Sequence, residues 1–395
     1  MSLDQSSALI EQLSRLGQKV SDGDHNARME ALELSRRLSS SLEKPENTAL
    51  DLAFSPFIVI AARISIDLNL FTLIVNRNGP ITSKELAELS GGEELLIIQI
   101  LRPLASTGFV EEVGERMWIA TPVTRAMAKE GIAAGHRLIG DMGVGVAMKA
   151  PAYLREAGYR CPVDPRDGFL QYAFQTKLTA FQFYMSRPQV LDDLNTFTGI
   201  AMGARENWVD WFPVEERLSN EVTITDSSPL LVDVGGGKGQ DLIAFRSKYP
   251  NLKGRLILQD LEPTISQIQN IDPAIELVAY DFFTEQPVTG SRAYFYHHVL
   301  HDWSDFKCLT ILEQVKKAMR PGYSKLLLHE MIVPERGAST FHAMFDLSMM
   351  AFNAGMERTE RQWEALLDEA GFRVVKFWLP MQNDADGIIE VMLNE

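Results

Sequence analysis

Short apolar runs alternate with stretches of helical periodicity from Ser228 onward. Apolar runs without polar alternation are typical of strands buried on both faces of a sheet. The seven runs cover residues 230–234, 255–258, 276–279, 293–299, 325–329, 374–377 and 388–392. Strands that alternate with helices predict an α/β fold, in which a doubly wound and mostly parallel sheet of seven strands is covered by helices on both faces.

The length of 395 residues exceeds the size at which one hydrophobic core normally keeps growing, so more than one domain is expected. We expect a helical domain over residues 1–125, a helical and aromatic-rich region over 126–225, and the sheet domain over 226–395. Helices of the sheet domain are predicted over residues 241–248, 306–319 and 359–370, because a proline or a glycine follows each of them closely.

The first domain begins with two amphipathic helices over about residues 5–43, interrupted at 21–24, whose apolar faces suggest a partner surface. An apolar helix is predicted over 57–73, and Thr82 with Glu85 then forms a capping-box pattern. A helix over 93–107 and strands over 109–113 and 116–120 complete the helix, helix, hairpin order of a winged helix. The helix over 93–107 begins with acidic residues and continues with apolar ones. We therefore expect a structural or dimerisation module rather than a DNA-binding one.

The net charge of −15, with no compensating basic block, argues against a phosphate-backbone partner, so no nucleic-acid binding is expected. Cys161 and Cys308 stand far apart and support neither a disulfide framework nor a zinc site. We therefore expect no metal and a cytoplasmic location. The N-terminal residues lack the pattern of a targeting segment and no apolar run approaches about 18 residues, so no membrane partner is expected.

A glycine-rich turn follows the first strand of the sheet, with Gly235, Gly236, Gly237 and Gly239 in close succession. Glycine adopts positive φ at no steric cost and lets the backbone approach a ligand closely. In doubly wound sheets, ligands lie beyond the carboxyl ends of the strands, where the strand order switches. The turn is therefore predicted to bind a nucleotide-like ligand.

Acidic residues follow the next two strands. Asp260 ends the second strand, where a carboxylate accepts hydrogen bonds from ribose hydroxyls. Asp281 and Phe282 end the third strand, and a carboxylate beside an aromatic ring suits the amine and the flat face of an adenine. Each acid alone is equally typical of a helix cap or a surface turn, but together they favour an adenosine ligand. The later strand ends carry His301, Asp302 and Glu330.

The phosphate-binding motifs decide which adenosine ligand is favoured. The chain lacks the Gly-x-x-x-x-Gly-Lys-Ser/Thr loop, and its glycine spacing is not Gly-x-Gly-x-x-Gly, so ATP and dinucleotides are disfavoured. S-adenosylmethionine carries an amino acid in place of phosphates and needs the close backbone approach without the full anion cradle. S-adenosylmethionine is therefore the predicted cofactor.

Five segments carry a resemblance to a known family, at residues 231–239, 259–261, 281–283, 300–303 and 357–360. Together and in this order they resemble the plant and fungal small-molecule O-methyltransferases of the caffeic-acid type, and the similarity runs from about residue 50 onward. The resemblance implies a Rossmann-like, class I methyltransferase fold. It also implies a homodimer built through the N-terminal domain.

The resemblance assigns expected roles to individual residues. The residues expected to bind S-adenosylmethionine are Gly235, Gly236, Gly237, Asp260, Asp281 and Phe282. The residues expected at the catalytic centre are His301 as general base, Glu330 and Glu357 flanking it, and Asp302 beside it. At His297, four positions before the base, many relatives carry Lys or Arg, so the form of the expected cofactor contact there is left open.

The chemistry of methyl transfer agrees with these roles. Transfer from a sulfonium is an in-line displacement that needs an anionic nucleophile. A phenol with a pKa of about 10 is mostly protonated at neutral pH, whereas an imidazole with a pKa of about 6.5 is mostly neutral and can accept its proton. A carboxylate on the far ring nitrogen would fix the imidazole tautomer, which is the role expected of Glu357, with Glu330 on the other side. His301 is therefore predicted to activate a phenolic or enolic hydroxyl.

The acceptor is expected to be a small aromatic or polyketide-type metabolite. Its predicted contacts are His136, Met349 and Phe352, although ordinary core packing explains these side chains equally well. Some fungal proteins of this family keep S-adenosylmethionine bound as an electrostatic element and catalyse pericyclic ring closures or dehydrations instead. His136 keeps this alternative open, whereas the intact His301 favours methyl transfer.

Overall fold

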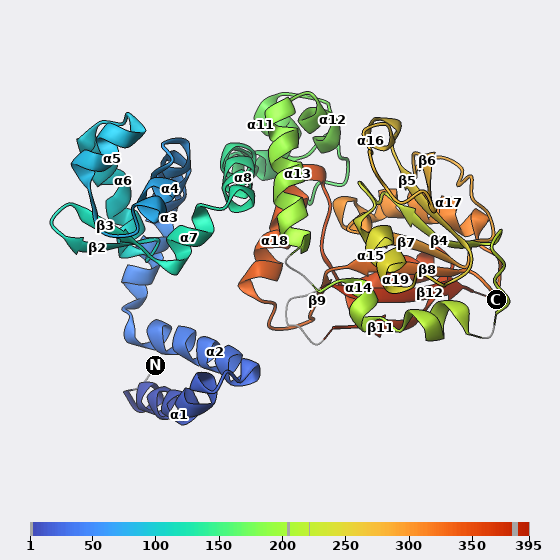
Figure 1. Cartoon of the computed structure of the whole chain (residues 1–395), viewed down its shortest axis with the longest axis horizontal. Coiled ribbons are helices and arrows are strands. Elements are labelled where there is room, and N and C mark those ends of the chain that lie inside the picture. The colour runs from blue at the N-terminus through green and yellow to red at the C-terminus, as the bar shows by residue number, and fades with distance from the viewer. Residues whose placement is uncertain (1–2, 204–205, 221, 381–385, 395) are drawn as a thin grey trace. The chain divides into compact units, whose positions relative to one another are not determined.

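The computed structural model of the chain describes residues 3–203, 206–220, 222–380 and 386–394 (Figure 1). The chain divides into two compact units, Met1–Lys129 and Glu130–Glu395. The first unit ends close to the predicted boundary at residue 125. The helical region predicted as a separate part over 126–225 instead belongs to the same unit as the sheet, because a late helix of the chain packs into its core.

The first unit begins with the two helices expected over residues 5–43, α1 (Leu3–Ser21) and α2 (His25–Leu42), which pack against each other. The carboxylate of Asp24 caps α2 by accepting a hydrogen bond from the amide of Ala27 at 3.0 Å. The helix predicted over 57–73 is in fact two, α3 (Pro45–Asp67) and α4 (Leu70–Arg77). Asn69 separates them with a φ of 57°, a left-handed conformation that asparagine tolerates better than most residues.

The remainder of the first unit follows the predicted order of helices and strands. Its elements are β1 (Ile81–Thr82), α5 (Ser83–Ser90), α6 (Glu94–Ser106), β2 (Val110–Gly114), β3 (Met117–Ala120) and α7 (Pro122–Met127). The capping box is confirmed, since Thr82 Oγ1 accepts from the Glu85 amide at 3.2 Å and Glu85 Oε2 accepts from the Thr82 amide at 2.9 Å. Most apolar side chains of α6, including Leu101 and Leu104, are buried as expected, whereas Leu95 and Leu96 in its first turn are exposed.

The second unit opens with a group of mostly short helices. They are α8 (Glu130–Leu138), a π-helical turn (Ile139–Val144), α9 (Gly145–Ala147), α10 (Ala150–Glu156), α11 (Phe169–Phe174), α12 (Ala180–Met185), α13 (Pro188–Gly203), α14 (Trp208–Trp211) and a second π-helical turn (Glu215–Ser219). Helix α18 (Thr340–Asn353) adds Ala351 and Phe352 to the apolar cluster of α8 and α11. This contact joins residues 130–203 to the sheet part of the chain.

The sheet has the seven strands that the sequence predicted, in the order β11-β12-β8-β7-β4-β5-β6. Their bounds are β4 (Pro229–Val234), β5 (Arg255–Asp260), β6 (Ile275–Ala279), β7 (Ala293–His297), β8 (Lys325–Glu330), β11 (Phe372–Trp378) and β12 (Gly387–Leu393). All neighbours pair in parallel except β12, which is antiparallel to both β8 and β11. The strand order switches between β4 and β7, which is where such sheets bind their ligands.

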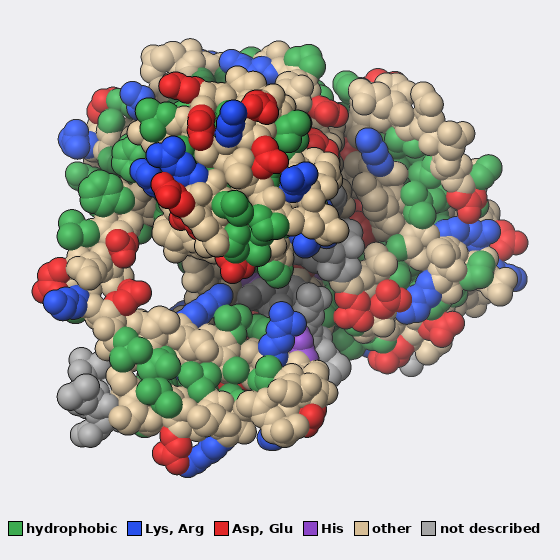
Figure 2. Space-filling model, turned by 60° about the vertical axis from the view of Figure 1, so that its left-hand side comes forward, with side chains coloured by type: hydrophobic (Ala, Val, Ile, Leu, Met, Phe, Trp, Pro, Cys, Tyr) green, Lys and Arg blue, Asp and Glu red, His purple; other side chains and the backbone are tan. Residues whose placement is uncertain are grey.

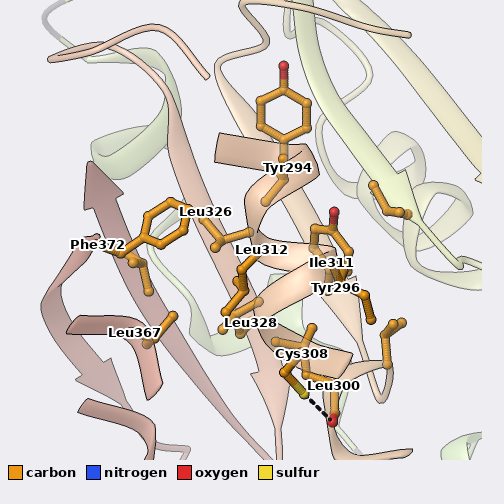
Figure 3. Close-up of a cluster of buried hydrophobic side chains, with 14 of the residues drawn as sticks. Tyr294, Tyr296, Leu300, Cys308, Ile311, Leu312, Leu326, Leu328, Leu367 and Phe372 are labelled. Atoms are coloured by element: carbon orange, nitrogen blue, oxygen red, sulfur yellow. Dashed lines mark hydrogen bonds between the residues drawn. The ribbon is translucent and has the colours of Figure 1, made fainter. Parts of the chain in front are cut away.

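Helices cover both faces of the sheet, each over its own apolar core. The helices between the strands are α15 (Gln240–Lys248), α16 (Glu262–Ile265), α17 (Asp305–Ala318) and α19 (Glu360–Glu369). Figure 3 shows part of one core, where Cys308, Ile311 and Leu312 of α17 lie among side chains of β7 and β8. The other core holds α14 and α15. A small parallel pair, β9 (Ile332–Val333) with β10 (Arg358–Thr359), lies outside the main sheet.

The inner strand β12 carries a buried charge. Glu390 is fully buried and accepts hydrogen bonds from Arg217 Nη2 at 2.8 Å, from the ammonium of Lys325 and from Trp378 Nε1 at 3.0 Å. The pKa of this carboxyl is lowered, because the hydrogen bonds and the two cations outweigh the opposing effect of burial. The cluster ties the second π-helical turn and β8 to β12.

Trp208 anchors the core beneath α14, stacked 4.7 Å from Phe295 and 5.9 Å from Phe245 between ring centroids. Its side chain is 1% exposed. Trp208→Ala is expected to lower the free energy of unfolding by about 3–5 kcal/mol, because it leaves a large apolar cavity. Urea denaturation followed by circular dichroism measures this change. Phe306→Ala, which truncates a ring that is 68% exposed, is the matched control, and an equal effect of the two substitutions would contradict the prediction.

Candidate active site

The glycine turn follows β4 directly and is packed tightly against the sheet. The amides of Gly235 and Gly236 both donate to the carbonyl of Gln259, at 2.8 and 3.2 Å. Gly235 and Gly237 have φ values of 73° and 57°, in the left-handed region that favours glycine. A Cβ at Gly236 would lie 2.3 Å from Asp233 Oδ2. The turn therefore requires glycine for both its conformation and its close packing.

Asp260 lies at the carboxyl end of β5, against this turn. Its Oδ2 accepts a hydrogen bond from the amide of Gly237 at 2.9 Å, and its Oδ1 accepts from the amide of Leu261 at 2.7 Å. Two backbone donors thus fix the orientation of the carboxylate. Each oxygen retains a second lone pair that can accept from a hydroxyl of a ligand.

Asp281 and Phe282 follow β6 and lie near the same turn. Asp281 Oδ1 accepts from the amide of Phe283 at 3.0 Å, which fixes the carboxylate in the loop. The Phe282 ring comes within 3.7 Å of the position that a Cβ at Gly235 would occupy. The structure therefore brings together the glycines, Asp260 and the Asp281 loop, as the sequence predicted.

A third acid at the glycine turn, Asp233, was not predicted. Asp233 is fully buried beneath the turn, and neither carboxylate oxygen has a hydrogen-bond partner among the described protein atoms. Burial raises the pKa of Asp233 well above its usual value, and the charges of Asp241 and Asp260 add to the shift. A single acid inside the apolar run 230–234 was the signal that could have identified it. A carboxyl without protein partners next to the glycine turn fits a ligand that approaches the backbone closely and donates hydrogen bonds.

His301 lies in the short 3-10 turn Leu300–Asp302 that follows β7, and its side chain is buried. Its Nδ1 is 2.7 Å from Oε1 of Glu357, which is also buried. Asp302 Oδ1 stands 3.7 Å from the other ring nitrogen, Nε2. The expected partnership of His301 with Glu357 is therefore present in the structure, and Asp302 stands on the opposite side of the ring.

Glu330, at the carboxyl end of β8, contacts the backbone of the His301 turn. Its Oε1 accepts from the amides of Val299 and Leu300, at 3.2 and 2.8 Å. The sequence predicted this carboxylate as a flanking group of the imidazole, and the structure gives it the further task of holding the turn. Burial raises the pKa of Glu330 to about 7, while the charge of His301 opposes the shift and that of Glu357 adds to it.

The carboxylates around His301 change its basicity. Burial lowers the pKa of the imidazole, but the charges of Asp302, Glu357 and Glu330 and the Glu357 hydrogen bond outweigh it and raise the pKa to about 10. Burial raises the pKa of Asp302 to about 6 against the opposing charge of His301. A free imidazole has a pKa of about 6.5, and the neighbouring acids raise the pKa of His301 above that reference value. The carboxylates around His301 therefore favour the charged form of its imidazole.

His297, the other histidine expected near the cofactor, pairs with an acid of α15. Its Nδ1 lies 2.8 Å from Oδ2 of Asp241, and its ring lies 3.9 Å from that of His329 and 4.7 Å from that of His298. Asp241 is in the first turn of the helix that follows the glycine turn, so His297 borders the predicted cofactor site. These residues, with Asp386, are ligand types for a divalent metal that the cysteine count did not suggest. The hydrogen bond accounts for the His297–Asp241 pair without one.

The predicted substrate contacts lie on two helices of the second unit. His136, on α8, is partly buried, and burial lowers its pKa. Met349 and Phe352 are partly buried on α18, and the Phe352 ring packs edge-on against Tyr184 at 6.1 Å. The contacts described for these three side chains do not include His301. The ring of α18 that faces His301 is Phe345, at 6.0 Å, which sequence reasoning missed.

Comparison with known proteins decides the family. An O-methyltransferase domain matches residues 215–373. The O-methyltransferase penC of Penicillium thymicola is 49% identical over 391 residues, which cover 98% of this chain and 97% of the relative. The chain belongs to the O-methyltransferase family. The confirmed predictions are the family, the class I fold and the enzyme class.

Two solved structures match this O-methyltransferase over its whole length. LepI in complex with S-adenosylmethionine has a TM-score of 0.86 at 30% sequence identity, and 100% of each chain is covered. A pericyclic reaction enzyme has a TM-score of 0.85 at 30% identity, again with 100% of each chain covered. The predicted cofactor, S-adenosylmethionine, is thereby confirmed for the family.

Removal of the Glu357 charge tests the electrostatics of this site. Glu357→Gln is expected to lower the pKa of His301 by about one unit or more, because the amide keeps the hydrogen-bond partner but loses the anion. NMR titration of ring-labelled histidines measures the shift, and His301→Ala identifies the resonance. Glu360→Gln removes an exposed carboxylate three residues away and is the control. An unchanged His301 titration in Glu357→Gln would contradict the assignment.

Proposed function

We propose that this enzyme transfers the methyl group of S-adenosylmethionine to a phenolic or enolic hydroxyl of a small aromatic or polyketide-type metabolite, with His301 as general base. The observation that carries the proposal is the 2.7 Å hydrogen bond between His301 Nδ1 and Glu357 Oε1. It leaves Nε2 as the ring nitrogen that can take a proton from the acceptor. His301 follows β7, which is the neighbour of the strand that carries the glycine turn, and Glu357 reaches it from the segment before β10.

The residues around the turn fit the cofactor. The backbone of Gly235, Gly236 and Gly237 would lie against it, Asp260 would accept from its ribose hydroxyls, and Asp281 with Phe282 would border its adenine. These residues and Asp233 fit S-adenosylmethionine, because the site offers acceptors for hydroxyl and amine groups and no cradle for phosphates. The bound cofactor supplies an activated methyl group.

The raised pKa of His301 favours its role as a base for weak acids. A phenol has a pKa of about 10, so a base with the ordinary imidazole value would take its proton only against a large free-energy difference. The charges of Asp302 and Glu357 raise the pKa of His301 toward that of a phenol, so the proton passes from the acceptor to the imidazole at a lower free-energy cost. Glu357 then stabilises the imidazolium that remains after the methyl group has been transferred.

Aromatic side chains near His301 support a flat acceptor. Phe345 lies 6.0 Å from the imidazole and stacks on Phe341 at 5.5 Å, both from α18. Trp303, two residues after His301, lies 6.3 Å from Phe181 of α12. Rings arranged in this way suit a planar aromatic or polyketide-type substrate.

A second candidate function is a cofactor-bound pericyclic reaction. The observation that favours it is the pair of carboxylates of Glu357 and Asp302 beside the His301 ring, because they favour an imidazolium, which can polarise a substrate without removing a proton. The similarity to a pericyclic reaction enzyme supports the same alternative. The two candidates differ in whether the methyl group leaves the cofactor.

The two candidate functions are distinguished by incubating the enzyme with methyl-labelled S-adenosylmethionine and a panel of phenols, pyridones and polyketide-type enols. His301→Ala is expected to lower kcat for label transfer about 100-fold or more, because general base catalysis is lost, with little change in the Kd of the cofactor. His25→Ala, in α2, is the control. Isomerisation of the substrate without label transfer would favour the pericyclic candidate. Full label transfer by His301→Ala would contradict the proposal that His301 is the general base.

The pH dependence follows from the same site. Since kcat/KM depends on the deprotonated fraction of His301, it is expected to rise about tenfold per pH unit from neutral pH until it levels off near the pKa of about 10. Glu357→Gln should move the plateau to lower pH, because it lowers that pKa. A bell-shaped dependence of kcat/KM on pH, centred near pH 6.5 in the wild-type enzyme, would be inconsistent with the raised pKa of His301.

We also propose that the enzyme is a homodimer built through the first unit. The apolar surface of α3 supports this part of the proposal. Hydrophobic side chains stand open at the molecular surface in Figure 2. Those of α3 that are exposed include Leu50, Leu52, Phe54, Phe57, Val59 and Ile60. Within the described residues, α3 alone is long and apolar enough to cross a membrane by length and composition, although Asp51 and Arg63 interrupt it. We propose that a second copy of the chain covers this helix.

Phe57→Glu is expected to convert the dimer into a monomer, because it places a charge in the proposed interface. Size-exclusion chromatography with light scattering gives the mass of the wild-type chain and of the variant. Leu89→Glu, at a side chain of α5 that is 62% exposed, is the control that should stay dimeric. A wild-type mass equal to the monomer of 44.3 kDa would contradict the proposal. Co-sedimentation of the wild-type chain with lipid vesicles would favour a membrane in its place.

A further inference from the structure

The turn that carries His301 offers four successive main-chain carbonyls, and each accepts a hydrogen bond from one short segment, residues 353–358. The four contacts are Leu300 O with Arg358 Nη1 at 3.2 Å, His301 O with the amide of Met356 at 2.9 Å, Asp302 O with Asn353 Nδ2 at 2.8 Å, and Trp303 O with Arg358 Nη2 at 2.9 Å. The segment therefore binds the backbone of the whole turn, and these contacts do not depend on the side chains of the turn.

Arg358 contributes the two outer contacts of this set and is itself fully buried. Its guanidinium also donates to Asp305 Oδ1, from Nε at 3.0 Å and from Nη2 at 2.8 Å. Asp305 is the first residue of α17, so one side chain joins the beginning of the turn, its end and the next helix. A planar fork with five donors can make these contacts together, whereas the single ammonium of a lysine cannot.

The segment also approaches the turn more closely than side chains would allow. A Cβ at Gly355 would lie 2.2 Å from the carbonyl oxygen of His301 and 2.6 Å from the carbonyl carbon of Asp302. Two stretches of backbone are thus in direct contact here. Cys308 adds a weaker contact from α17, since its Sγ donates to the carbonyl of Leu300 at 3.2 Å (Figure 3).

Glu357 belongs to the same segment, between Met356 and Arg358. The distance between His301 Nδ1 and Glu357 Oε1 is therefore set by how the segment docks on the turn. We propose that Arg358 is a positioning residue, which holds the turn on residues 353–358 so that His301 keeps its hydrogen bond to Glu357. The proposal rests on the proposed function in that His301 is the base, and it assigns Arg358 no contact with the reacting atoms.

A second buried arginine provides a matched comparison. Arg292 donates to the carbonyl of Leu218 at 3.0 Å and to that of Arg217 at 2.9 Å, and it also donates to the carbonyl of Tyr323. It directly precedes β7, whereas the His301 turn follows the other end of that strand. Substitution of either arginine breaks hydrogen bonds to buried carbonyls, so both should cost stability. A specific effect on His301 is expected of Arg358 alone.

The experiment compares Arg358→Lys with Arg292→Lys in the full chain. The pKa of His301 is measured in the resting protein by NMR titration of ring-labelled histidines, and kcat, KM and the Kd of S-adenosylmethionine are measured alongside. Arg358→Lys is expected to lower the pKa of His301 and to lower kcat about tenfold or more, because misplacement of a catalytic group is costly. The Kd of the cofactor should change less than about twofold. Arg292→Lys should leave the His301 titration and kcat near the wild-type values.

A His301 titration and a kcat that respond equally to the two substitutions would overturn the proposal, since a purely structural role predicts that result. Asn353→Leu, which removes the donor to Asp302 O, provides a second variant should Arg358→Lys fail to fold. It is expected to shift the His301 titration in the same direction. The proposed function fails separately, when His301→Ala retains full methyl transfer. In that case the titration of His301 in Arg358→Lys still tests the positioning role.

Discussion

The hydrogen bond between His301 and Glu357 joins two groups that would be costly to bury alone. An isolated charge loses its hydration on burial, and an ion pair compensates only when the geometry is good and the remaining polar atoms find partners. Here the imidazole is surrounded by three carboxyls, two of which have raised pKa values. The fold must therefore keep this group of acids close to the ring while it excludes water. Much of the second unit serves that requirement.

The cofactor turn and the base lie near each other because their strands are neighbours. Strands β4 and β7 pair in parallel, with Asp233 opposite Phe295, so their carboxyl ends emerge at the same edge of the sheet. The switch of strand order at this place leaves room for a ligand between the two loops. Fixed strand pairing thus determines the separation between the glycine turn and the turn that carries His301. Small changes in loop sequence can alter the substrate without changing this separation.

The sequence predicted the parts of the structure that depend on local pattern. The five inner strands are mostly buried on both faces and form apolar runs in the sequence, and the capping box of Thr82 and Glu85 is a short-range signal. The sequence did not predict the break between α3 and α4, because the apolar pattern continues through Asn69, whose left-handed backbone conformation separates the two helices. The union of residues 130–225 with the sheet was also missed, since it depends on packing by α18, from far along the chain.

The site shows the same division between local and distant information. The glycine turn, Asp260 and the histidine of the β7 end could be found from spacing, and Glu357 could be assigned from resemblance. The contacts of Arg358 with the His301 turn could not, because they join residues more than fifty positions apart. The raised pKa of His301 could not be predicted either, since a sequence supplies the reference pKa but neither the burial nor the neighbouring charges. Asp233 could have been noticed as the single acid of an apolar run, but its lack of hydrogen-bond partners among the described protein atoms is visible only in the structure.

The position of β12 has a consequence for how the protein folds. This strand is the last in the sequence, yet it lies between β8 and β11 and carries Glu390 into contact with Arg217 and Lys325. During synthesis, both cations are made before their acid, so the sheet cannot close and their charges stay uncompensated until residues 387–393 have been added. The second unit therefore reaches its native state only after nearly all of it has been synthesised. A premature stop anywhere before β12 should leave an open sheet edge exposed to chaperones and proteases.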